Sequence, residues 1–156
     1  MWSGYLWFEW FILGVSFQVT FDCLDPDGLA KFWAQVLHYK EQDPPAGFVT
    51  WEEFLRAHKI PEDEWNSASA IVDPEGKGSR VYFQKVSEPK TVKNRVHLDI
   101  NVSGGRAVPE EERKKKIHAE AERLIGLKAT KLNVVQESGE FWIVMCDPEG
   151  NEFCLQ

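Results

Sequence analysis

Apolar and polar residues follow two patterns in the first forty residues of the domain, one after the other. Residues 17–23, FQVTFDC, alternate between apolar and polar types and are rich in β-branched and aromatic side chains, which predicts a strand. The next stretch, DPDGLAKFWAQVLHYK, repeats its apolar residues at helical spacing, with Asp25 as the N-cap and Pro26 in the first helical position. We expect this helix to lie on a sheet and YKEQD at 39–43 to begin a second strand.

Residues 43–66 break this rhythm and are predicted to form a helical insertion. DPPAGFV is typical of a loop, Thr50 and Glu53 make a capping box, and Pro61 begins a second helical segment. After the insertion, SASAIVDP and SRVYFQKV predict two strands joined by a DPEGKG turn.

The second half of the chain repeats the same order of elements. NRVHLDINV is an alternating strand, 109–129 is an amphipathic helix, and TKLNVV, FWIVMC and EFCLQ are three more strands. A second DPEG joins the last two of them, 74 positions after the first, and the opening strands match Gln18 to His97, 79 positions apart. The chain is therefore predicted to be an α+β protein of two tandem βαβββ modules, about 17–90 and 94–156.

Composition narrows the function classes. The chain has 156 residues and a net charge of −7, which disfavours nucleic acid as a partner because nucleic-acid binders are usually basic. Its three cysteines are an odd number and do not resemble a secreted disulfide framework, so a reducing, cytoplasmic location is favoured.

Two further segments need separate interpretation. Residues 1–16 are strongly apolar but are interrupted by Glu9, too short for a membrane span and without the basic start of a secretory signal, so we interpret them as an N-terminal extension and expect no membrane partner. The basic run Arg113–Lys116 follows Glu110–Glu112 at a spacing of four residues. This spacing predicts solvated ion pairs on a helix rather than a phosphate site.

Four stretches carry a resemblance to a known superfamily: DCLDPDGLAKFWAQVLHY, WNSASAIVDPEGKGSRVYFQKV, KNRVHLDINV and WIVMCDPEGNEFCLQ. They resemble the glyoxalase, bleomycin-resistance and extradiol-dioxygenase group, the vicinal oxygen chelate (VOC) superfamily, and above all its bacterial glyoxalase-like branch. The resemblance implies that the two modules curl their sheets into a cleft that binds a small molecule. Sharing of such clefts in the family also implies a homodimer.

The resemblance further implies a divalent metal, held by two His or Gln and two Glu from the first and last strands of each module. By position these roles fall to Gln18 and Gln84 in the first module and to His97 and Cys154 in the second. Neither last-strand position holds glutamate, a departure that disfavours a true methylglyoxal lyase. Asp99 or Glu152 replaces a ligand if the register shifts by two residues.

Strand alternation supports a polar cleft independently of the resemblance. If Val19, Phe21 and Cys23 face the helix, the residues between them face the cleft, and the same parity applies to the other strands. An exposed sheet face would give the same alternation. This parity predicts the following cleft residues: Gln18, Thr20, Asp22, Tyr82, Gln84, His97, Asp99, Asn101, Trp142, Glu152 and Cys154. Four of them are candidates for binding substrate: Thr20, Tyr82, Trp142 and Glu152.

The chemistry of these residues leaves three kinds of function open. His97 and Cys154 suit a zinc-like or softer metal, whereas the glutamines are weak ligands. Without metal, His97 and Asp99 are neighbours on one face and suit acid–base catalysis. The predicted function is thus a lyase, isomerase or dioxygenase-like enzyme of the VOC type, with a non-catalytic protein that sequesters a small molecule, or a structural partner domain, as the alternatives. The other histidines, His38, His58 and His118, are predicted to lie at the surface or to pack.

Overall fold

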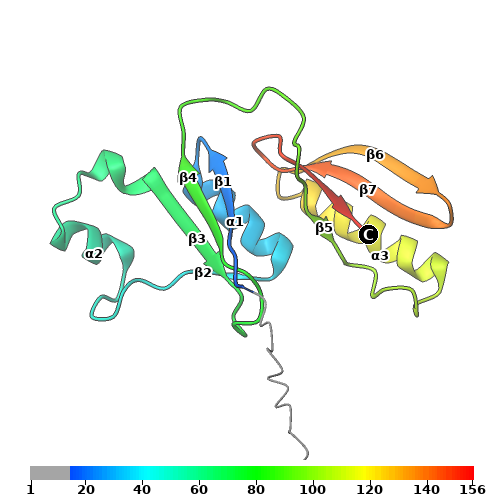
Figure 1. The fold of residues 1–156 in the computed structure, drawn as a ribbon, viewed down its shortest axis with the longest axis horizontal. Helices are drawn as coiled ribbons and strands as arrows, with labels where there is room; N and C mark the ends of the chain where they lie inside the picture. Colours follow the sequence, from blue (N-terminus) through cyan, green and yellow to red (C-terminus); the bar gives the residue numbers. More distant parts are fainter. Residues whose placement is uncertain (1–14) are drawn as a thin grey trace, which may run out of the picture.

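The computed structural model describes residues 15–156, and it contains the two predicted βαβββ modules (Figure 1). The first module comprises β1 (Val19–Cys23), α1 (Pro26–Leu37), β2 (Lys40–Glu41), β3 (Ala68–Val72) and β4 (Val81–Lys85). The second comprises β5 (Asp99–Ile100), α3 (Glu110–Ile125), β6 (Thr130–Glu137), β7 (Glu140–Cys146) and β8 (Glu152–Leu155). The predicted α+β fold of tandem modules is confirmed.

Each module has its own four-stranded sheet, and the two sheets have the same topology. Their strand orders are β1-β4-β3-β2 and β5-β8-β7-β6. In each sheet the first strand of the module pairs in parallel with the last, and the other pairs are antiparallel. The parallel pairs set β1 beside β4 and β5 beside β8, so residues from the two ends of a module meet.

The two DPEG segments form the same turn. The carboxylate of Asp73 accepts hydrogen bonds from the backbone amides of Glu75, Lys77 and Gly78, and that of Asp147 accepts from Glu149 and Asn151. Gly76 and Gly150 have φ values of 69° and 87°, a conformation in which glycine has no Cβ to clash. Aspartate and glycine are therefore favoured at both turns.

One apolar core joins the modules. Trp33 on α1 is fully buried and packs with its ring 5.2 Å from that of Phe153 on β8. Its indole nitrogen donates to Asp147 Oδ2 at 3.1 Å, so the second DPEG turn is bound to the first module. On the other side, α3 buries Ile117, Ala121 and Leu124 against the second sheet.

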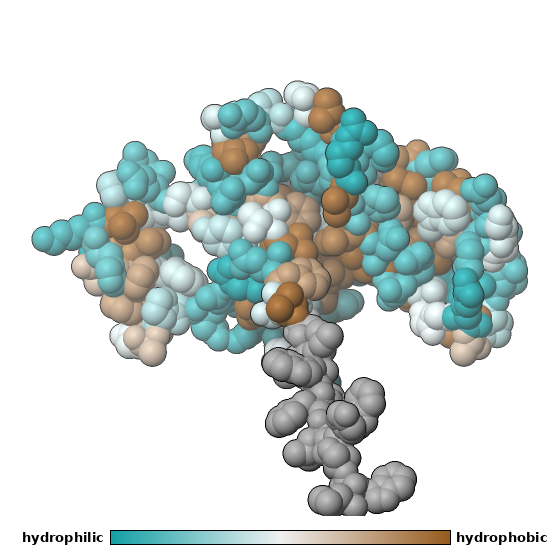
Figure 2. Space-filling model, in the orientation of Figure 1, coloured by the Kyte–Doolittle hydropathy of each residue, from teal (hydrophilic) through white to brown (hydrophobic). Residues whose placement is uncertain are grey.

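The predicted helical insertion is present between β2 and β3, as α2 (Trp51–Ala57) and the 3₁₀ helix η1 (Glu62–Ser67). Thr50 caps α2 as expected, since its hydroxyl accepts from the amide of Glu53 at 3.2 Å. α2 projects from the body (Figure 1) and buries none of its residues. Its aromatic side chains pack on one another instead, and apolar surface shows there in Figure 2.

Two details of the prediction are wrong. The strand expected over 94–102 is limited to β5, and Val96, expected to face the helix, is 80% exposed. β5 pairs with β8 only at Asp99 and Ile100, and the amide of Asn94, at the start of the expected strand, donates to the side chain of Glu152 instead of to a neighbouring strand. The predicted extension 1–16 lies, except for Val15 and Ser16, outside the described residues; within residues 15–156 no helix has the length and hydropathy needed to cross a membrane.

Candidate active site in the second module

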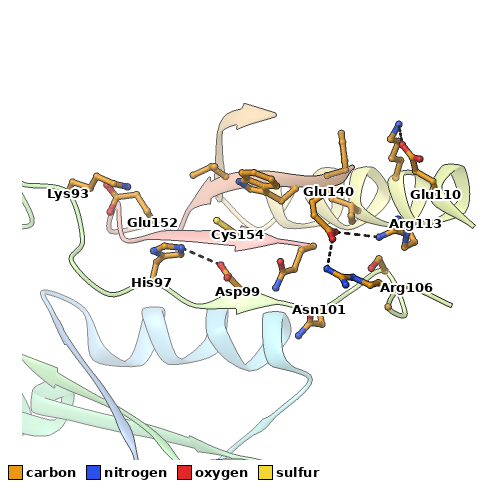
Figure 3. Close-up of a pocket in the computed structure, with 18 residues that line it drawn as sticks. Lys93, His97, Asp99, Asn101, Arg106, Glu110, Arg113, Glu140, Glu152 and Cys154 are labelled. Atoms are coloured by element: carbon orange, nitrogen blue, oxygen red, sulfur yellow. Dashed lines mark hydrogen bonds and ion pairs between the residues drawn. The ribbon is translucent and has the colours of Figure 1, made fainter. Parts of the chain in front are cut away.

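The second module forms an open cavity of about 740 Å³ whose lining residues all lie between Lys93 and Gln156 (Figure 3). The segment around β5, the start of α3, β7 and β8 supply its walls. A volume of this size suits a small organic molecule.

A cluster of three potential metal ligands lies on the β5–β8 side of this cavity. Asp99 and Cys154 are direct partners in the parallel pairing of these strands, and His97 comes two residues earlier on the same face. His97 Nε2 lies 3.4 Å from Asp99 Oδ1, and one donor atom of each residue lies within 4.8 Å of the other two. The parallel pairing therefore brings together residues that are far apart in the sequence.

This donor set fits a divalent metal with open coordination positions. One imidazole, one carboxylate and one thiol supply nitrogen, oxygen and sulfur, a combination found in zinc and other first-row metal sites. Burial, followed by the negative charge of Asp99, raises the pKa of the Cys154 thiol to about 11. A metal would therefore have to displace a proton from this thiol to bind it.

The predicted four-residue ligand set is not assembled in one cavity. Gln18 accepts from Arg80 Nη1 at 2.8 Å and Gln84 donates to Asp22 Oδ1 at 2.7 Å, and neither glutamine lines a described cavity. The physical reason is that β1 and β4 form the first sheet, whose polar face does not contribute to the large cavity of the second module. Asp99 takes part in the cluster in their place.

A smaller cavity of about 260 Å³ lies where the two modules meet, and Thr20 and Asp22 line it together with His97 and Glu152. Glu152 is held by Lys90 Nζ at 2.9 Å and by the amide of Asn94 at 3.0 Å. Burial alone would raise the pKa of Glu152, but these two donors outweigh it and hold the pKa at about 2. Glu152 therefore fastens the segment that links the modules, as an anion, beside both cavities.

The remaining predicted cleft residues divide between the site and its surroundings. Trp142 lines the large cavity next to Phe141, which gives it an aromatic wall. Tyr82 lies outside both cavities, with the guanidinium of Arg80 4.9 Å above its ring. His38, His58 and His118 are exposed, as expected.

Sequence reasoning missed the basic residues of the cavity wall. The predicted ion pairs of α3 are confirmed for Lys114 with Glu110 at 2.7 Å and for Lys116 with Glu112 at 2.9 Å. Lys114 and Glu110 also line the cavity, and Arg113 turns toward it together with Arg106 from the loop before the helix. The signal was present, because Arg113 precedes the buried Ile117 by four residues and so shares its helix face.

Comparison with known proteins identifies the family of the chain. The family model of the glyoxalase-like domain matches residues 18–156. The chain belongs to the glyoxalase-like domain family. No curated protein matches this glyoxalase-like chain.

Solved structures share the fold at low sequence identity. A hypothetical protein, SA1046, from S. aureus has a TM-score of 0.58 and 12% identity, covering 92% of this chain and 93% of its own. A glyoxalase/bleomycin resistance protein/dioxygenase family enzyme from Burkholderia phytofirmans has a TM-score of 0.55 and 16% identity, covering 88% and 94%. A mutant of the fosfomycin resistance protein FosX from Listeria monocytogenes, in complex with Mn(II) and 1S,2S-dihydroxypropylphosphonic acid, has a TM-score of 0.56 and 12% identity. The match covers 93% of this chain and 90% of the FosX chain.

Proposed function

We propose that this glyoxalase-like protein is an enzyme that acts on a small oxygen-containing molecule in the cavity of its second module, with a divalent metal held by His97, Asp99 and Cys154. The observation that carries the proposal is the mutual approach of these three donor groups within 4.8 Å on the wall of a cavity of about 740 Å³. A metal bound there would supply Lewis-acid polarisation of an oxygen atom of the ligand.

The protein's own groups would perform the other tasks. Phe141 and Trp142 would present apolar ring surface to the body of the ligand. Glu152 is paired with Lys90 and accepts from the amide of Asn94, so it would hold the wall in place. The last-strand ligand positions of the two modules hold Gln84 and Cys154, and neither is a glutamate, which argues against methylglyoxal lyase chemistry. His97 and Asp99, 3.4 Å apart, are alternatively a base and the carboxylate that orients it if no metal is used.

Elemental analysis of purified protein tests the proposal. The protein is purified without chelator and without a nickel column, then reconstituted separately with Mn(II), Fe(II), Co(II) and Zn(II) and desalted. We expect about one equivalent of metal in the wild type with at least one of these ions, and loss of that metal in His97→Ala, because the variant removes one of only three strong ligands. His58→Ala, an exposed histidine on the insertion, serves as the matched control and should retain the metal.

The thermal midpoint of each variant checks that the fold is intact. The side chain of His97 is 46% exposed, so its loss should leave the midpoint of the metal-free protein nearly unchanged. A wild type that takes up none of the four metals would contradict the metal-assisted enzyme and favour the second function, sequestration of a small molecule. The cytoplasmic location and the homodimer stay predictions.

A further inference from the structure

Arg113 occupies an unusual position on the wall of the cavity. It lies one helical turn before Ile117, which is 2% exposed and also lines the cavity, and its own side chain is only 20% exposed. The helix therefore presents a guanidinium group from a largely buried side chain to the cavity.

The guanidinium group of Arg113 has no hydrogen-bond partner among residues 15–156. Its Nε is fully buried and unpaired, and the carboxylate oxygen that approaches it, Glu140 Oε2, lies 3.9 Å from Nη1. That distance is too long for a hydrogen bond. A ligand in the cavity would therefore meet the Nη groups of Arg113, whose donors are not used by a protein acceptor in the described residues, and an acceptor that arrives there would be bound favourably.

The neighbouring cations differ from Arg113 in this respect. Arg106 Nη2 donates to Glu140 Oε1 at 2.6 Å, and Lys114 Nζ pairs with Glu110 at 2.7 Å. Arg106 is also 86% exposed, so it meets water freely. Among these three, Arg113 is the group with free donors on the cavity side, and the fork of a guanidinium matches the two oxygens of a carboxylate.

The two ends of the cavity have different chemistry. Figure 3 shows His97, Asp99 and Cys154 toward one end and Arg113, Arg106 and Glu140 toward the other. Phe141 and Trp142 add aromatic wall to the same cavity. A ligand that satisfies all three parts has an anionic group, an apolar or aromatic body and a separate oxygen function.

We propose that Arg113 anchors the carboxylate of the ligand, so that the substrate class of this site is small molecules with an apolar body that bear a carboxylate. This inference rests on the proposed function, because it assigns the substrate class of the same cavity. It adds a specificity residue from α3 to a site whose proposed metal ligands come from β5, the segment just before it, and β8.

Binding of matched small compounds tests the anchor. We would titrate ¹⁵N-labelled protein with 3-phenylpropanoate, its neutral amide 3-phenylpropanamide, and phenylphosphonate, and follow the arginine Nε–H signals by NMR. We expect the carboxylate to bind at least about tenfold more tightly than the amide and to shift the Nε–H signal of Arg113, as assigned from Arg113→Gln. Comparison with phenylphosphonate distinguishes a carboxylate site from one for any compact anion, and tighter binding of the phosphonate would overturn the carboxylate assignment.

Two variants separate Arg113 from general charge. In Arg113→Gln the preference for carboxylate over amide should disappear, whereas Arg106→Gln should keep it within about threefold, although each variant removes one positive charge. Glutamine is a good helix former, so α3 should stay intact, which circular dichroism verifies. Equal loss in both variants, or no binding of the carboxylate to wild type at millimolar concentration, would overturn the inference.

The outcome is distinguishable from a failure of the proposed function. The titrations are repeated on metal-free protein and on His97→Ala, in which the guanidinium is unchanged. A carboxylate preference that persists in a protein that binds no metal would support the anchor and contradict the metal-assisted enzyme. Bound metal without any carboxylate preference would support the metal site and contradict the carboxylate anchor.

Discussion

At the scale of single residues, Asp25 links two parts of the first module. Its carboxylate accepts from the amide of Gly28 at 3.1 Å, which caps α1, and from Asn66 Nδ2 at 2.7 Å, which binds the end of the insertion to the helix start. The hydrogen bond from Asn66, followed by that from Gly28, lowers the pKa of Asp25. The ionised side chain therefore stabilises the folded state.

We predict that Asp25→Ala lowers the free energy of unfolding by about 1 kcal/mol at pH 7, the usual loss for an N-cap. Because the folded pKa lies below the unfolded value of about 3.9, the contribution is complete above that pH and is lost as the pH falls through the folded pKa. Urea unfolding at several pH values should show wild type and variant converging in acid. Asp43→Ala, an exposed loop carboxylate, is the control, and a difference that persists unchanged well below the folded pKa would contradict this account.

The sequence predicted part of the candidate site, because alternation along a strand shows which residues share a face of the sheet. His97, Asp99, Cys154, Glu152 and Trp142 alternate with apolar neighbours, and the structure places all five on the cavity wall. Gln18 and Gln84 obey the same parity but belong to the other sheet, and alternation carries no information about which sheet face closes a cavity. Arg113 was overlooked because its charged neighbours favoured a solvated face.

At the scale of elements, the two DPEG turns are alike in local structure and differ in surroundings. Asp147 is 2% exposed and accepts from Trp33 and Asn151 in addition to backbone amides, whereas Asp73 accepts from backbone amides alone and is half-buried. Burial raises the pKa of Asp147, against the opposing effect of its donors, while amide hydrogen bonds lower the pKa of Asp73. The repeat thus provides a natural pair for comparison.

We predict that Asp147→Ala is destabilising by about 3 kcal/mol, because it leaves the buried indole N–H of Trp33 and two amides without acceptors. Asp73→Ala should be destabilising by only about 1 kcal/mol, since water can reach the amides of Glu75 and Lys77. Urea unfolding of both variants measures the difference. Equal effects would mean that the contact with Trp33 adds nothing beyond the turn itself.

Most elements could be predicted because each has a strong local signal. Asp25 and Pro26 start α1, the repeated DPEG places two hairpins, and Thr50 starts α2. The extent of β5 could not be predicted, because Asn94, at the start of the expected strand, bonds to the side chain of Glu152, 58 residues later, instead of to a neighbouring strand. Pairing partners across a module are a property of the folded sheet, not of the strand's own residues.

At the scale of the whole molecule, the modules are joined more firmly by their core than by the segment that links them. Thr91, Val92 and Lys93 in that segment are exposed, and Val92 is 72% exposed. In contrast, Phe32 and Trp33 of the first module pack with Phe153 of the second, with ring centres 6.2 and 5.2 Å from it.

We predict that a chain cut between Thr91 and Val92, at an inserted protease site, keeps both halves together. The cut protein should elute from gel filtration at the size of the intact chain, because separation would expose the buried rings. In Phe153→Ala, which should be destabilising by about 3–5 kcal/mol, the same cut should release the halves. Release without the substitution would show that the connection, not the core, holds the modules.

The placement of the large cavity within residues 93–156 makes the two copies of the repeated unit unlike each other. The second copy holds the residues of the proposed site, and its strands β6 and β7 follow each other without an insertion. The first copy accommodates α2 and η1 between two of its strands, at a distance from those residues. The insertion thus adds length and surface to one half of the duplicated architecture, apart from the half that holds the proposed site.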